Sequence, residues 1–147
     1  MSKDLQHNIT EKYSILIDQY TDDKTDGTIV DLAGAEACRV LIPVAAVGAG
    51  DSSNYFTIKV EVGDNADLSD AADLAATDYI EPVNGAGEAW ANRRINATAM
   101  ANTLLSFGFL SQGKRYARVV AVETSTADAT FGAIIQKGTL RNTVFGS

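Results

Sequence analysis

Few residues of this chain could carry out catalysis. It has one histidine, His7, and one cysteine, Cys38. His7 falls in a segment that we expect to be an amino-terminal arm, whereas a catalytic base must be held rigidly beside its nucleophile. Cys38 opens an alternating apolar run, so we interpret it as a small core residue. No nucleophile elbow or phosphate-binding glycine loop is present, and the sequence predicts no catalytic residue and no enzyme.

Metal binding has one candidate, the acidic segment 63–70, which reads Gly-Asp-Asn-Ala-Asp-Leu-Ser-Asp. Its spacing does not fit an EF-hand, because the sixth position is not glycine and the twelfth is not glutamate. One histidine and one cysteine cannot build the usual tetrahedral zinc site. We therefore predict a solvated acidic loop over 63–76, with a bound cation as the alternative, and we expect no cofactor.

Two aromatic residues could instead stack on a sugar. Trp90 follows the Gly-rich stretch 85–87, and Tyr79 precedes it. A tryptophan flanked by alanines is more typical of a packing anchor. A carbohydrate-binding site would need both rings exposed along one groove.

Charge is unevenly distributed along the chain, whose net charge is −7. Residues 60–92 contain eight acids and no Lys or Arg, whereas residues 93–147 contain seven bases and two acids. The pattern predicts either a solvated acidic loop or a molecule with an acidic side and a basic side. The negative total argues against general nucleic-acid binding. No stretch has the apolar length of a membrane span or a signal peptide, so we expect no membrane partner.

Three bases cluster at Lys114, Arg115 and Arg118. Arg115 and Arg118 are an odd number of residues apart, so a regular strand would place them on opposite faces and cover one more than the other. Each base could pair with a local carboxylate or with a neighbouring subunit.

Alternating apolar residues dominate the chain, and long helical periodicity is missing. Tyr55–Val62 is the clearest half-buried strand, and 114–123 is the second. Pro43 lies inside the long apolar run 38–47, which indicates a bulge or an edge position there. The other expected strands are 13–19, 27–32, 77–81, 104–110 and 131–137, while 95–102 could be a strand or a short helix.

This spacing predicts one all-β domain, an antiparallel β-sandwich of the jelly-roll or immunoglobulin-like kind with about seven to nine strands. We expect an arm over 1–12, the sandwich over 13–138 and an extended tail over 139–147. The predicted core contains Ile15, Ile17, Val40, Ile42, Phe56, Ile58, Val60, Leu105, Val119, Ala121 and Ile134.

Three segments resemble the head decoration, or cement, proteins of tailed bacteriophages. They are Gly50-Asp-Ser-Ser-Asn-Tyr-Phe-Thr-Ile58, Gly113-Lys-Arg-Tyr-Ala-Arg-Val-Val120 and Phe131-Gly-Ala-Ile-Ile-Gln-Lys-Gly138. The resemblance implies a sandwich bound to the outside of a capsid in the virion, assembled in the cytoplasm of a host bacterium. It implies two partners, the major capsid protein and further copies of this chain as a dimer or trimer.

We expect the contacts to involve the terminal arms and the basic cluster. The candidate interface residues are His7, Lys12, Lys114, Arg115, Arg118, Leu140, Arg141 and Phe145. A tail-tube or other tail or neck protein and a carbohydrate-binding adhesin module are the alternatives.

Overall fold

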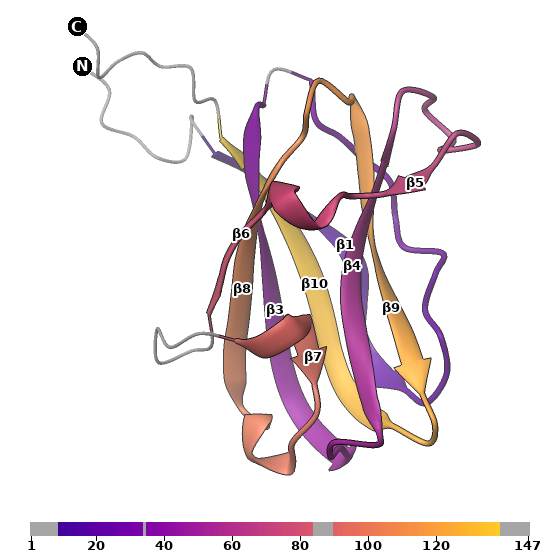
Figure 1. Cartoon of the computed structure of the whole chain (residues 1–147), viewed down its shortest axis with the longest axis vertical. Helices are drawn as coiled ribbons and strands as arrows, with labels where there is room; N and C mark the ends of the chain where they lie inside the picture. The colour runs from indigo at the N-terminus through magenta and orange to yellow at the C-terminus, as the bar shows by residue number, and fades with distance from the viewer. Residues whose placement is uncertain (1–8, 34, 84–89, 139–147) are drawn as a thin grey trace, which may run out of the picture.

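The computed structural model describes residues 9–33, 35–83 and 90–138. Two antiparallel sheets pack face to face as an all-β sandwich, which confirms the predicted fold class (Figure 1). The described residues form ten strands, three of which contain only two residues and carry no readable alternation. Sheet A has the order β1-β10-β3-β8-β6, and sheet B has the order β2-β9-β4-β5, with β7 also paired to β4.

The strands have the following bounds. Sheet A consists of β1 (Ile9–Tyr20), β3 (Ala37–Ala49), β6 (Tyr79–Val83), β8 (Thr103–Leu110) and β10 (Asp128–Gly138). Sheet B consists of β2 (Val30–Asp31), β4 (Tyr55–Gly63), β5 (Ala72–Asp73), β7 (Arg94–Ile95) and β9 (Tyr116–Thr124). Short 3-10 turns lie at Ala76–Asp78, Ala91–Arg93 and Thr98–Met100. Among the described residues, no helix is long and apolar enough to cross a membrane.

The core lies between the sheets and is filled by alternate residues of each long strand. Phe131 of β10 packs against Phe56 of β4 with ring centroids 5.2 Å apart, joining the two layers. Of the predicted core, all residues are fully buried except Ile17 and Ile134. Alternation along β4 and β9 thus identified the inward residues correctly.

Strand β1 departs from simple alternation, and this makes the predicted core position of Ile17 wrong. Its pairing with β10 shifts twice, between Tyr13 and Ile15 and between Ile15 and Asp18. Each shift inserts one extra residue, as a β-bulge does, and reverses the side to which later residues point. Ile15 is fully buried, whereas Tyr13 and Ile17 are exposed.

Two other predictions are wrong, and they concern Pro43 and the boundary of the amino-terminal arm. Strand β3 lies between β10 and β8, so the edge position suggested by Pro43 is wrong. The irregularity lies two residues further on, where Thr130 pairs with Ala46 but Phe131 pairs with Val44. Strand β1 begins at Ile9, so Lys12 lies in a strand, opposite Ile135, and not in an arm.

Candidate interaction surfaces

The basic cluster is paired with carboxylates of this same chain. Arg118 Nε lies 2.7 Å from Glu61 Oε2, because β9 and β4 are neighbours with these two residues in register. Lys114 Nζ lies 2.8 Å from Asp64 Oδ2, and an Arg115 nitrogen lies 3.1 Å from Asp31 Oδ2. Each of the three bases therefore has a carboxylate partner in this same chain. This is one of the two alternatives that the sequence left open, the other being a partner in a neighbouring subunit.

As predicted, one of the two arginines, Arg115 and Arg118, is more covered than the other. The Arg118 side chain is 24% exposed and the Arg115 side chain 56%. The Arg115 guanidinium, by hydrogen bonding, holds the pKa of the Asp31 carboxyl below its usual value, and Asp64 raises the pKa of Lys114 in the same way. The charge difference between residues 60–92 and 93–147 is thus partly neutralised in the fold, since β4 and β9 lie side by side.

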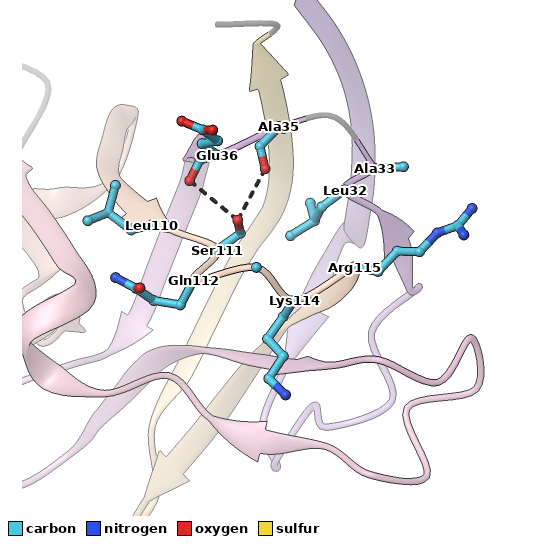
Figure 2. A pocket seen from close by; sticks show the side chains of 10 residues that line it. Leu32, Ala33, Ala35, Glu36, Leu110, Ser111, Gln112, Lys114 and Arg115 are labelled. Atoms are coloured by element: carbon cyan, nitrogen blue, oxygen red, sulfur yellow. Dashed lines mark hydrogen bonds between the residues drawn. The ribbon is translucent and has the colours of Figure 1, made fainter. Parts of the chain in front are cut away.

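An open groove of about 790 Å³ lies at the end of the sandwich beside this cluster. Figure 2 shows its wall, where the Ser111 hydroxyl donates to the Ala35 carbonyl at 3.1 Å and approaches that of Glu36 at 3.4 Å. These bonds join the turn after β8 to the segment before β3. The groove is lined by Leu32, Ala33, Ala35, Glu36, Leu110, Ser111, Gln112, Gly113, Lys114 and Arg115.

The groove residues suit structural roles better than catalysis. Ser111 is buried and engaged with backbone carbonyls, and the two bases are held by Asp64 and Asp31. Cys38 lies in the core, where burial raises the pKa of its thiol to about 11 and keeps it protonated at neutral pH.

The acidic loop uses its carboxylates to close on itself. Asp70 accepts hydrogen bonds from the backbone N–H groups of Asp64 (2.8 Å) and Asn65 (3.1 Å), which lower its pKa. Asp67 accepts the N–H of Ser69. Within the described ranges, no group of three His, Cys, Asp or Glu side chains could hold a metal ion.

Trp90 is a packing residue. It is 3% exposed, it packs near Phe107, and its indole N–H donates to the carbonyl of Arg94 at 2.7 Å. The Tyr79 ring is covered by the Arg93 guanidinium, 3.7 Å from the ring centroid. Trp90 therefore has no exposed face on which a sugar could stack, and the adhesin alternative loses its main support.

The outer face of sheet A carries an apolar band that sequence reasoning missed. Paired residues of neighbouring strands share a face, and the register gives a first row of Tyr13, Ile134, Leu41, Ser106 and Val83. Pro43 and Leu104 form a second row. Ile17 extends this row, because its side chain covers Gly132, where an added Cβ would lie 2.7 Å from Ile17 Cγ1. Because the inward neighbours of these residues are buried in the core, the rows point outward.

The band is partly open to solvent, and its members Ile134, Leu41, Pro43 and Val83 are half-buried. The exposed large hydrophobic residues are Tyr13 (43%), Ile17 (49%) and Leu104 (47%) of the band, with Leu16 (68%) and Ile80 (37%) outside its two rows. All five lie on strands of sheet A. Polar residues border the band at both ends, with Glu11, Gln136 and Arg39 at one end and Gln19, Thr130 and Asp128 at the other.

The outer face of sheet B has the opposite character. Lys59 pairs with Asp73 and Arg118 with Glu61 across its strands, and the Arg94 guanidinium lies 4.1 Å from the centroid of the Tyr55 ring. The ion pairs of this face lie within the chain, whereas the buried Nε of Arg94 has no hydrogen-bond partner among the described residues. An apolar face with a polar border, opposed by a self-paired charged face, is typical of a protein-binding surface on sheet A.

The candidate contact residues predicted from the sequence are only partly placed. Lys12 is exposed on β1. His7, Leu140, Arg141 and Phe145 lie outside the described residues. The apolar band went unrecognised because its members come from five strands, and only the register brings them into rows.

Comparisons with known proteins give little to place the chain. No family model matches it, and no curated protein matches it. A solved structure similar to it is the crystal structure of the SPBc2 prophage-derived protein YomS, with a TM-score of 0.44 and 12% sequence identity. The match covers 86% of this chain and 94% of that one. Similarity at this level assigns no function.

Proposed function

We propose that this chain is a structural virion protein that binds the outer surface of a phage capsid and stabilises the shell. The observation that carries the proposal is the apolar outer face of sheet A. A folded domain that exposes Tyr13, Ile17 and Leu104 together is suited to bind another protein. The sequence resemblance of segments 50–58, 113–120 and 131–138 to decoration proteins implies the two partners of such a protein, the capsid and further copies of this chain.

The chemistry of the remaining surface agrees with a structural role. Lys114, Arg115 and Arg118 form ion pairs within the chain, and the groove beside them holds no nucleophile with an adjacent base among the described residues. Such ion pairs join separate segments of one domain to each other. We assign capsid contact to the surface around Lys12 and to the terminal segments 7–12 and 140–145.

The tail-tube alternative is less well supported. Tube subunits form rings through their sheet edges and usually carry one long loop. Here edge strand β1 is interrupted by two bulges, which oppose the addition of a further strand. The loop expected over 63–76 is tied to the body, through β5 pairing with β4 and through the Lys114–Asp64 ion pair.

Binding to shells that lack the chain tests the proposal. Purified protein is mixed with shells assembled from the major capsid protein alone, and separately with its unassembled subunits. A decoration protein stabilises the shell by binding the assembled state and not the free subunit, by about 2.7 kcal/mol per site at 100 times the dissociation constant. We expect saturable co-sedimentation with shells, a higher shell melting temperature and no binding to free subunits. No co-sedimentation, or equal binding to free subunits, would contradict the proposal.

A further inference from the structure

The apolar band of sheet A is large enough for a specific interface. Its five strands, about 4.8 Å apart, span about 24 Å, and the eight residues from Arg39 to Ala46 of β3 span about 27 Å. Two such faces packed together would bury roughly 1,300 Å² in total. A specific protein interface needs about 1,000 Å², so the band alone meets the requirement for a dimer.

The two ends of the band differ in the charge on their inner strands, with Arg39 on β3 at one end and Asp128 on β10 at the other, while Glu11 of edge strand β1, at the Arg39 end, accepts a hydrogen bond from the Gln136 amide. Arg39 lies outward at one end, between the inward residues Cys38 and Val40. Asp128 lies outward at the other end, between the buried residues Ala127 and Ala129, and Gln19 Nε2 donates to its carboxylate at 2.9 Å. Among the described residues, Arg39 has no carboxylate partner of its own, unlike Arg115 and Arg118.

This arrangement fits one symmetry. A two-fold axis in the plane of the interface and perpendicular to the strands reverses the strand direction and keeps β3 over β3. The end of one copy that carries Arg39 then lies over the end of the second copy that carries Asp128. An axis parallel to the strands would instead place the two Arg39 ends together, which like charge disfavours.

We propose that the outer face of sheet A binds a second copy of this chain in a two-fold dimer, with Leu41, Pro43 and Leu104 at the centre and Arg39 opposite Asp128. An isologous interface uses the same patch twice, and the band is apolar at its middle and polar at both ends, as the centre and rim of an interface are. At the β1 edge of sheet A, two bulges oppose edge-to-edge strand pairing, which is another simple route to a dimer. The dimer takes this face for the second copy and leaves capsid contact to the surface around Lys12 and the terminal segments, so failure of the dimer and failure of capsid binding are separate outcomes.

Sedimentation-equilibrium ultracentrifugation of the full chain tests the dimer. We expect a monomer–dimer equilibrium, and we expect Leu104→Glu to weaken it at least about tenfold, since a central apolar contact dominates an interface. Thr57→Glu, at the paired outer face of sheet B, is the matched control and should leave the equilibrium unchanged. Circular dichroism melting of each variant establishes that it folds.

A charge exchange tests the symmetry. Arg39→Glu alone should weaken the dimer, and Arg39→Glu combined with Asp128→Arg should restore it. Monomer at roughly 100 μM, a trimer or larger ring, or a dimer that Leu104→Glu leaves intact would overturn the proposal. If Leu104→Glu disrupts the dimer, but adding Asp128→Arg does not restore the dimer that Arg39→Glu weakens, the two-fold arrangement is overturned.

Discussion

The hydroxyl of Ser14 accepts a hydrogen bond from the backbone N–H of Val119 at 2.8 Å and so joins the edge of sheet A to sheet B. The same hydroxyl donates to the carbonyl of Thr28 at 2.9 Å, and the Thr28 N–H donates to the Ser14 carbonyl. Ser14 is the extra residue of the first β1 bulge. The bulge that breaks the alternation therefore also closes one side of the sandwich.

Ser14→Ala should destabilise the fold by about 1–3 kcal/mol, because it leaves the Val119 N–H buried without an acceptor. Urea unfolding followed by tryptophan fluorescence at one fixed protein concentration measures the loss. Ser52→Ala, at an exposed serine in the turn before β4, is the control and should change stability little. Equal effects of the two substitutions would show that the Ser14 bridge contributes nothing.

Gly132→Ala should destabilise by about 1–3 kcal/mol through overpacking. A Cβ at Gly132 would lie 2.7 Å from Ile17 Cγ1 and 3.0 Å from the Ile15 carbonyl oxygen. Gly108→Ala is the matched change on the same face of sheet A, where the nearest atom, Ile80 Cβ, lies 3.3 Å away. The melting temperature of Gly132→Ala should lie well below that of Gly108→Ala. The reverse order would show that Ile17 does not cover Gly132.

Local sequence patterns were enough to predict some parts of the structure and not others. Strands β4 and β9 were predictable because alternating apolar residues state directly which side faces the core. Ile17 was misplaced because a bulge is set by pairing with a distant strand, and no residue type in 13–17 announces it. The ion pairs of Arg115 with Asp31 and Lys114 with Asp64 join residues 84 and 50 positions apart, so only the topology could reveal them. The apolar band needed the register of five strands for the same reason.

Cys38 should be unreactive in the folded protein. Burial excludes reagent and raises the pKa of the thiol to about 11, so little thiolate forms at neutral or mildly alkaline pH. Labelling with a thiol reagent at pH 8 should be slow in buffer and fast in denaturing urea. Rapid, complete labelling of the native protein would contradict the placement of Cys38 in the core.

The Asp31–Arg115 pair predicts a pH dependence. The pKa of Asp31 lies below its usual 3.8 in the fold, chiefly because of the Arg115 hydrogen bond and also because of the Ala33 N–H. The pair therefore stabilises at pH above the unfolded pKa, and this contribution is lost as pH falls through the folded pKa. Arg115→Gln should raise the Asp31 pKa, measured by carbon-detected NMR titration, and should reduce stability at pH 7 but not below about pH 2.

Arg39→Gln is the control for that titration, since Arg39 lies on the opposite sheet from the Asp31 pair. It should leave the Asp31 pKa unchanged. An Asp31 carboxyl that titrates identically in wild type and Arg115→Gln would mean that the pair does not form in solution.

Quantitative mass spectrometry of purified phage particles from the source of this chain tests the central claim most directly. We expect hundreds of copies per particle, in a fixed ratio to the major capsid protein. A few copies per particle would place the chain in the tail or neck, and its absence from particles would contradict a virion role altogether.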